Sequence, residues 1–476
     1  MRRRGWRLLI WLVVAAAVCA ACGSTAGRRR LVAGNQPGRI GGRANAALAE
    51  QSVAGAGEQA AAPAGEATAG AATGSSGSQS TSAAGAQGRA AGVGGTATRA
   101  NASQPGAGAK SEILLGSIGT SSGIIGESTA IIPAATRAWA STVNERGGLN
   151  GHPVRVLYAD TGADPGRAQA LVTRMDQQDH VLAFISLYSV TETPVIASYL
   201  DAHRIPAIGA PGGDASEDTS TMIFDPQQGA DAGVSWGALL AVTSQSDKRK
   251  VAILYCSEAA SCSNQDKRIK EFAPKAGVQV VSELQISIAQ PDYTAAVIAA
   301  RNAGADVVCV LADSASIIRV AQSAHRQGWS PIVSGTYTIN NQAMVRANPA
   351  DTEGMLGFSA TAPYASSPLL ADYRAAMERF APGEELGGYG ATAWVQDKLW
   401  ERIAPALGDN PTRDGILAAL YALRRETLGG LIPPVTFPQG PHGNVNLCGV
   451  PIKVSGGKIT APQGDKFVCA PGWAPL

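Results

Sequence analysis

The chain has 476 residues and a formal net charge of +2, with 39 basic and 37 acidic side chains. A balance this close to neutrality gives no support for a nucleic-acid partner or for attraction to an anionic membrane surface. The length predicts two or three domains. Much of the abundant glycine (56 residues) lies in one segment, so the folded part is smaller than the length suggests.

The N-terminus is typical of an export signal. The basic stretch Arg2-Arg3-Arg4 precedes an apolar run from Leu8 to Ala21 that is too short to span a membrane. The small residues before Cys22 resemble the signal of bacterial lipoproteins, which predicts a signal peptide over 1–22 and a lipid on Cys22. Cys19 is a weaker acceptor because Val18 stands where a small residue is wanted. An ordinary secretory signal is the alternative, and either interpretation places the protein outside the cytosol.

Residues 23–110 form a segment of low complexity, made mostly of Ala, Gly, Ser, Thr and Gln. Such a chain cannot bury enough apolar surface to offset the entropy lost on ordering. We therefore expect a disordered tether, with a root-mean-square reach of roughly 50 Å. The frequent Ser and Thr leave open whether the tether is a glycosylated stalk.

Alternating strands and helices begin after the tether. A buried strand is predicted over 113–118 and a helix over about 127–146, which Gly147 and Gly148 end by allowing a left-handed turn. A strand over 154–158, a helix over 165–178 and a strand over 181–185 follow. This order predicts a parallel sheet with helical crossovers.

The same region resembles one known family. The residues that carry the resemblance are Asn144, Gly147, Gly148, Leu149, Asn150, Gly151, Asp160, Asp164 and Pro165. They are similar to the signature of the branched-chain amino-acid (Leu/Ile/Val) binding proteins, which are type I periplasmic solute-binding proteins of ABC transporters. The order of elements agrees from about 112 to about 400, and the tail agrees only loosely.

The resemblance implies an α/β fold of two doubly wound, Rossmann-like lobes joined by hinge crossovers. A second series of predicted strands, over 251–255, 278–284, 306–311 and 331–334, fits a second lobe. We expect the N-terminal lobe to comprise 111–224 and 359–430. The C-terminal lobe and tail would comprise 225–358 and 431–476.

Ligand contacts are expected in loops that follow strands of the first lobe. Ser122 lies after the first strand, and Tyr188 and Ser189 lie after the third. Ser189 and Glu192 also have the spacing of a capping box, in which serine satisfies a free amide of the helix. In the family a serine at this position holds the ligand carboxylate, so the resemblance implies that role for Ser189. Tyr188 either lines the cleft or only packs.

The next loops depart from the family pattern. The family has a threonine that helps to hold an amino acid, where this chain has Gly212 and Gly213. An acidic residue of the second lobe binds the ligand ammonium in the family, but the corresponding loop carries Tyr337. Asp313 either replaces that acid or caps a helix. We retain Ala210, Gly212, Asp313 and Tyr337 as candidate ligand contacts.

The cysteines fit an oxidising compartment. We predict disulfides between Cys256 and Cys262 and between Cys448 and Cys469, and a buried free thiol at Cys309. The five cysteines after Cys22 lack C-x-x-C spacing and the histidines are scattered, so we expect no metal site.

Together these features predict a monomeric, lipid-anchored substrate-binding protein of an ABC importer, on the outer face of a bacterial cytoplasmic membrane. It would close on a small carboxylate-bearing solute, such as an amino acid or amide, and present it to a permease, with no cofactor and no catalytic residue. A sensory lipoprotein is the first alternative. The second is a serine hydrolase, because the loop Gly119-Thr120-Ser121-Ser122-Gly123 fits Gly-x-Ser-x-Gly. No Gly-x-Gly-x-x-Gly follows a strand, which disfavours a dinucleotide enzyme.

Overall fold

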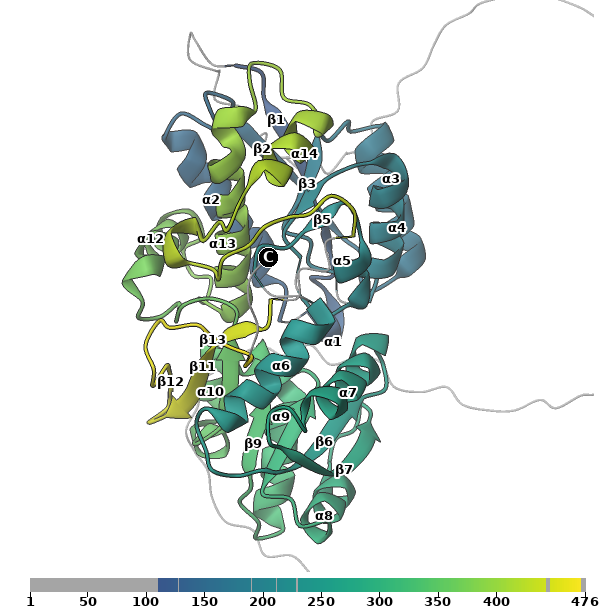
Figure 1. Ribbon diagram of the computed structural model, residues 1–476, viewed down its shortest axis with the longest axis vertical. Helices are drawn as coiled ribbons and strands as arrows, with labels where there is room; N and C mark the ends of the chain where they lie inside the picture. Colours follow the sequence, from purple (N-terminus) through teal and green to yellow (C-terminus); the bar gives the residue numbers. More distant parts are fainter. Residues whose placement is uncertain are drawn as a thin grey trace, which may run out of the picture. The chain divides into compact units, whose positions relative to one another are not determined.

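A computed structural model describes residues 110–471, except 127, 190, 211, 228–229 and 442–445. The predicted signal peptide, Cys22 and all of the predicted tether except its last residue, Lys110, lie outside this range. The described residues form two lobes, each an α/β sheet with helices on both faces (Figure 1). Within them no helix has both the length and the apolar character needed to cross a bilayer.

The sheet of the first lobe is entirely parallel, with the strand order β2-β1-β3-β4-β5. Its strands are β1 (Ile113–Gly119), β2 (Val154–Asp160), β3 (Ala183–Ile185), β4 (Ala207–Ile208) and β5 (Ile223–Phe224). Strands covered by helices on both faces are apolar along their length rather than alternating, and β1 and β3 follow this rule. The predicted parallel sheet is therefore confirmed.

Helices cover both faces of this sheet (Figure 1). One face carries α2 (Ile131–Glu145), α12 (Ala371–Phe380) and α13 (Gly388–Ile403), and the other carries α3 (Pro165–Gln177) and α4 (Thr193–His203). The smaller helices are α1 (Gly123–Gly126), α5 (Ala215–Thr219) and α14 (Arg413–Ala422), with the 3₁₀ turns η2 (Pro368–Leu370), η3 (Ala404–Ala406) and η4 (Leu428–Gly430). The helix predicted over about 127–146 begins later than expected, at Ile131. The Thr129 hydroxyl donates to the carbonyls of Thr120 and Gly126, and these bonds hold a turn before α2.

The second sheet has eight strands in the order β12-β11-β10-β9-β8-β6-β7, with β13 paired to β11. Its strands are β6 (Lys250–Cys256), β7 (Gln279–Ile286), β8 (Val307–Leu311), β9 (Ile332–Gly335), β10 (Leu356–Ser359), β11 (Cys448–Ser455), β12 (Lys458–Thr460) and β13 (Val468–Cys469). The strands from β6 to β10 run parallel, and the tail adds β11 and β12 antiparallel at the edge.

Two separate apolar cores lie on the two faces of the second sheet. The helices are α6 (Ala230–Thr243), α7 (Ala260–Phe272), α8 (Thr294–Asn302), α9 (Ser314–Arg326), α10 (Gln342–Ala347), α11 (Pro349–Thr352) and the 3₁₀ turn η1 (Tyr337–Ile339). Helices α6 and α7 pack on one face, and α8 and α9 on the other. Helix α6 is apolar around most of its circumference, which is typical of a helix buried on all sides.

Polar side chains join the segments that connect the lobes. The Gln227 amide donates to Ala360 O at 3.4 Å, and the Asn446 amide donates to Gln227 O. Burial raises the pKa of the neighbouring Asp225 to about 7, although that carboxyl accepts from Gln227 N and from the Gln396 amide. The three connecting segments are thus held to one another directly.

The expected lobe boundary at residue 431 is wrong. Leu431, Ile432, Val435 and Phe437 are buried in the core of the first lobe, so the chain returns to the second lobe only after Phe437. The sequence of this stretch contains turns and prolines but no periodic apolar pattern, which left its position undetermined.

Both predicted disulfides are confirmed. Cys256 at the end of β6 is bonded to Cys262 in α7, and Cys448 in β11 is bonded to Cys469 in β13. Cys309 is free and buried in the middle of β8, as predicted, and burial raises the pKa of its thiol to about 12.

Replacing Cys448 and Cys469 together by alanine should lower the free energy of unfolding by about 3 kcal/mol, because the bond closes a loop of 21 residues. Replacing Cys256 and Cys262 together is the matched control and should cost about 2 kcal/mol, because that loop spans only 6 residues. Urea denaturation of the three proteins measures both values. Equal losses, or a larger loss for the short loop, would contradict the loop-entropy account.

Candidate functional site

A cavity of ≈ 110 Å³ lies between the two lobes, at the carboxyl ends of β6, β8 and β9. Open parallel sheets bind ligands at this edge because successive loops diverge there and leave a crevice. The second lobe supplies Cys256, Glu258, Ala259, Ser261, Cys262, Gln265, Ile288, Leu311, Ala312, Asp313, Thr336, Tyr337 and Thr338. The first lobe supplies Ser128, Thr191 and Tyr389.

The crevice continues beyond this cavity. A second hollow of ≈ 230 Å³ shares Ser128, Tyr337 and Tyr389 with it, and a third of ≈ 510 Å³ shares Ser128 and Asp313. The space between the lobes is therefore one extended groove rather than a single closed chamber.

The lobes contact each other at Gly212 and Gly213. The Tyr337 hydroxyl of the second lobe donates to Gly212 O, and the Gln265 amide donates to Gly213 O at 3.5 Å. Gly213 has φ +143°, and a Cβ there would lie 3.4 Å from the Tyr337 hydroxyl oxygen. Glycine at this position permits the backbone conformation, while a Cβ would make only an ordinary van der Waals contact with the second lobe.

Ser122 lies outside the lining of the cavity and is exposed. The neighbouring Ser121 amide donates to Asp160 Oδ1 at 2.8 Å, and Gly162 N donates to the same atom at 3.2 Å. Burial would raise the pKa of Asp160, but these bonds outweigh it and lower that pKa. The loops after β1 and β2 are thereby joined.

The loop that fits Gly-x-Ser-x-Gly lacks the partners of a nucleophile. In the described part of the chain, Ser121 makes no hydrogen bond to a histidine. His152 lies beyond the opposite end of β1, where its two ring nitrogens are bonded to backbone oxygens of Ser111 and Gly408. A serine hydrolase needs a base within hydrogen-bond reach of the hydroxyl, so the geometry does not support that alternative.

Ser189 is 1% exposed and is engaged with Glu192 in both directions. Its hydroxyl accepts from Glu192 N at 3.1 Å and donates to Glu192 Oε2 at 3.0 Å. The predicted bond from the Glu192 amide to the Ser189 hydroxyl is present, but α4 begins only at Thr193 with Glu192 at the N-cap position, so Ser189 does not cap the helix. The carboxylate, however, reciprocates to the Ser189 hydroxyl and to Thr191 rather than to the Ser189 amide.

Glu192 is 0% exposed and accepts from three loops of the first lobe. Thr120 Oγ1, after β1, donates to Oε1 at 2.7 Å, and Thr161 Oγ1, after β2, donates to the same oxygen. Thr191 donates to Oε2 through its amide at 3.0 Å and its hydroxyl at 2.9 Å. Glu192 forms no ion pair among the described residues.

The Glu192 carboxylate is ionised despite its burial. Burial would raise its pKa, but hydrogen bonds from Thr161, Thr120 and Thr191 outweigh it and hold the pKa below the ordinary value of 4.5. The positive end of the α4 dipole adds to this stabilisation, because Glu192 directly precedes the first helical residue.

Two other candidates of the first lobe do not face the cavity. Tyr188 is 1% exposed, and its hydroxyl donates to Ala159 O at 2.7 Å, so its side chain packs inside the lobe. Ala210 is also buried, and its carbonyl accepts from the Gln396 amide at 2.7 Å. Of the two interpretations of Tyr188, packing therefore applies, and Ala210 does not line the cleft as expected, because both loops turn inward to complete the core.

The second-lobe candidates do line the cavity. Asp313 caps α9 by accepting from Ala315 N at 3.2 Å, which is one of its two predicted roles, and it also lines the cavity. Tyr337 packs edge-on against Tyr389 of the first lobe, with ring centroids 5.1 Å apart. The sequence did not indicate Tyr389, which lies in the first turn of α13 and resembles an ordinary core aromatic.

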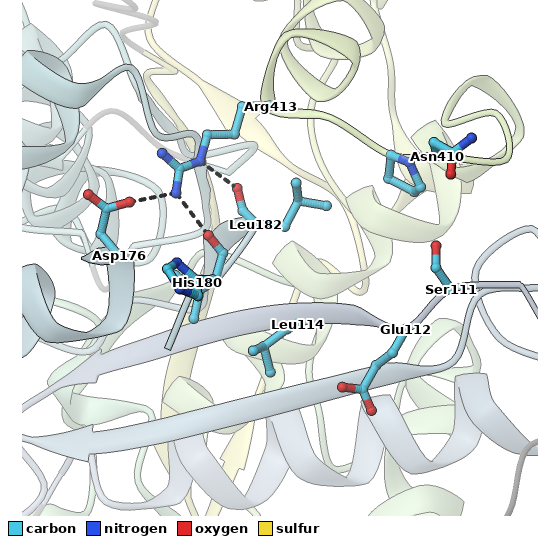
Figure 2. A pocket seen from close by; sticks show the side chains of 10 residues that line it. Ser111, Glu112, Leu114, Asp176, His180, Leu182, Asn410 and Arg413 are labelled. Carbon is cyan, nitrogen blue, oxygen red and sulfur yellow. Dashed lines mark hydrogen bonds and ion pairs between the residues drawn. The ribbon is translucent and has the colours of Figure 1, made fainter. Parts of the chain in front are cut away.

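A separate cavity of ≈ 550 Å³ lies at the amino ends of β1 and β3. Figure 2 shows the Arg413 guanidinium at its wall, directed at Asp176 and at two backbone carbonyls. It bonds Asp176 Oδ1 at 2.7 Å, Val181 O at 2.9 Å and Leu182 O at 3.1 Å. Arg413 thus fixes α14 to the first sheet. We interpret this cavity as a packing gap at the edge of the sheet opposite the inter-lobe groove.

Comparison with known proteins agrees with this geometry. A sequence profile described as periplasmic binding protein matches residues 112–458, which includes both lobes. The chain belongs to the periplasmic binding protein family. It is therefore a solute-binding protein of the ABC-transporter type, and membership implies an extracytoplasmic location.

Individual relatives of this periplasmic binding protein are distant. An amino acid binding protein of Pseudomonas aeruginosa is 26% identical over 176 residues, which is 36% of this chain and 45% of the relative. The substrate-binding protein LivJ of Streptococcus pneumoniae, in complex with isoleucine, has a TM-score of 0.63 at 15% identity and covers 75% of this chain and 99% of its own. A solute binding protein of Rhodopseudomonas palustris, in complex with 3,4-dihydroxy benzoic acid, has a TM-score of 0.62 at 16% identity, covering 76% and 98%. The structural likenesses establish the type I fold.

Replacing Glu192 by glutamine should destabilise the protein by about 3 kcal/mol at pH 7, because several charge-assisted hydrogen bonds are weakened at once. The folded-state pKa lies below the unfolded value, so this stability is present above about pH 4.5 and is lost as the pH falls through the folded pKa. The difference between wild type and Glu192→Gln should therefore shrink below pH 4.5.

Denaturation curves between pH 3 and pH 8 measure this difference. Glu271→Gln is the control, because Glu271 makes only an exposed ion pair with Arg268 and should change stability by less than about 1 kcal/mol at any pH. A difference that does not depend on pH would show that Glu192 is neutral in the folded protein.

Proposed function

We propose that this chain is the substrate-binding lipoprotein of an ABC importer, which closes by hinge bending on a small solute held between its lobes. The observation that carries the proposal is the cavity lined from both lobes at the carboxyl ends of parallel strands. A ligand in such a position contacts both lobes only when they are together, so its binding energy favours the closed form.

The hinge in this proposal is the set of connecting segments around Asp225, Gln227 and Ala360. They are short and are joined to one another by side-chain hydrogen bonds, so the lobes can rotate without separating. Closure would be completed by the contact of Tyr337 with Gly212. The closed surface would then be the form that a membrane permease recognises.

The anchor is the second part of the proposal. Lipidation of Cys22 would retain the protein at the outer face of the membrane, and residues 23–110 would link the lobes to that anchor. We further propose that it acts as a monomer, because one chain supplies both walls of the cavity.

A sensory lipoprotein is the second candidate, because the same closure could be read by a signalling partner. A neighbouring gene for a permease and an ATPase favours import, and a neighbouring gene for a kinase favours sensing. Uptake of the solute by membrane vesicles that contain the permease distinguishes the two directly.

The central test is a thermal-shift screen of residues 111–476 against amino acids, amides, amines, polyols and aromatic acids. A solute that binds only the folded state raises the melting temperature with concentration, and small-angle scattering should show compaction in its presence. A protein that neither gains stability nor becomes more compact with any solute class would contradict the proposal.

Tyr337→Phe should weaken binding of that solute roughly two- to tenfold, because it removes one hydrogen bond that forms between the lobes. Titration calorimetry measures the change. Tyr293→Phe is the matched control, since its hydroxyl bonds Ser287 O inside the second lobe and takes no part in closure. Equal effects of the two variants would count against a role of Tyr337 in closure.

Cys22→Ala should move the full-length protein from the membrane fraction to the soluble extracytoplasmic fraction, because it removes the only lipid acceptor in the proposal. Cys19→Ala should leave the protein with the membrane. Fractionation and immunoblotting of both variants check this. Release by Cys19→Ala and retention of Cys22→Ala would assign the anchor to the other cysteine.

A further inference from the structure

Glu192 occupies a position that has the properties of an anion site. The position lies at the N-terminus of α4 and at the carboxyl end of β3, where amide groups and the helix dipole favour negative charge. Five donor atoms surround it: the hydroxyls of Thr120, Thr161, Ser189 and Thr191, and the Thr191 amide. All five are directed at the two oxygens of one carboxylate, which belongs to the chain itself.

We propose that Glu192 is a built-in occupant of this anion site, and that the adjoining cleft therefore takes a small organic amine that lacks a carboxylate. The inference rests on the proposed function, because it names the solute class of the same cleft. The donors that a ligand carboxylate would need are already used, and Glu192 itself is closed off from solvent.

The charges around the cavity lead to the same solute class. Glu258 and Asp313 line it, and none of the described lining residues is Lys, Arg or His. Thr191 is also part of the lining and donates to the Glu192 carboxylate. The buried charge of Glu192 is therefore separated from the cavity by Thr191. An anionic solute in this cavity would meet the carboxylates of Glu258 and Asp313, with that of Glu192 behind the wall, whereas an ammonium group would be attracted by all three. Among the described residues, the cation of the groove is Arg319, which lines the adjoining hollow and donates to Ile288 O and to the Ser316 hydroxyl.

The second-lobe wall offers groups that suit an ammonium ion. Asp313 accepts only from α9 and keeps acceptor capacity on the cavity side, while hydrogen bonds from Ser287 and Ile288 fix Glu258. Tyr337 of this lobe and Tyr389 of the first lobe both line the cavity, with their rings at right angles to each other. An acid beside aromatic faces is a favourable environment for an organic cation, which the rings attract through their quadrupoles.

The first test needs no knowledge of the solute. Glu192→Ala removes the carboxymethyl part of the side chain, which has the size and charge of acetate, and leaves the donors in place. Sodium acetate should raise the melting temperature of Glu192→Ala in a concentration-dependent manner, on the order of a few degrees, relative to sodium chloride at equal ionic strength.

Acetate should not change the melting temperature of wild type or of Glu192→Gln, in which the position is filled. Failure of acetate to stabilise Glu192→Ala, or equal stabilisation of wild type, would overturn the assignment of this position as an anion site.

The second test compares matched solutes on the wild-type protein, so it does not depend on the variant being folded. The pairs are isoleucine against 2-methylbutylamine, and benzoate against benzylamine, with benzamide as the neutral member. Calorimetry and thermal shift should detect binding of an amine and no binding of the corresponding acid. Tighter binding of an acid or of benzamide would overturn the inference.

Asp313→Asn refines this test, because asparagine caps a helix as well as aspartate does but carries no charge. It should weaken binding of the amine roughly tenfold while leaving the melting temperature unchanged. Unchanged amine affinity in Asp313→Asn would remove Asp313 from the proposed site.

The two proposals fail in different ways. If acetate stabilises Glu192→Ala and an acid binds the wild type, the anion site stands and the solute class is overturned. If no solute of any class binds, the proposed function is overturned, while the acetate experiment still decides whether Glu192 fills an anion site.

Discussion

The two-lobed architecture depends on how the three connecting segments are held together. Gln227 is central, because its side chain bonds the second connection at Ala360 and its carbonyl accepts from the third at Asn446. Each bond is buried, so breaking it without replacement would leave an unsatisfied polar group. The lobes are thereby joined at this end by their connecting segments, and the groove lies where the sheets' carboxyl ends face each other.

Much of the fold could be predicted from the sequence, because its signals are local. Apolar runs between turns located the strands, and the placement of one cysteine pair around a single loop and of the other in the C-terminal tail indicated both disulfides. The lobe assignment of residues 431–437 was predicted wrongly because this stretch is irregular. Its burial depends on the space left between α13 and β5, not on an apolar pattern in its own sequence.

The candidate site was only partly predictable. The link between Ser189 and Glu192 is visible in the sequence, since they are three residues apart. The contributions of Thr120 and Thr161 are not, because they lie 72 and 31 residues away and reach Glu192 only through the strand order β2-β1-β3. A motif can thus identify where a group is bound, while the identity of the bound group depends on the side chains that converge there.

Cys309 gives the folding of this protein an order of events. Five cysteines lie in the folded part, and an odd number in an oxidising compartment allows wrong pairings as well as the two correct ones. The Cys309 thiol lies in β8, between β6 and β9, where neither oxidant nor another thiol can reach it. A chain whose central sheet forms first has already buried Cys309 when Cys448 and Cys469 are oxidised. Such a chain is therefore more apt to form the two native disulfides than one that is oxidised earlier.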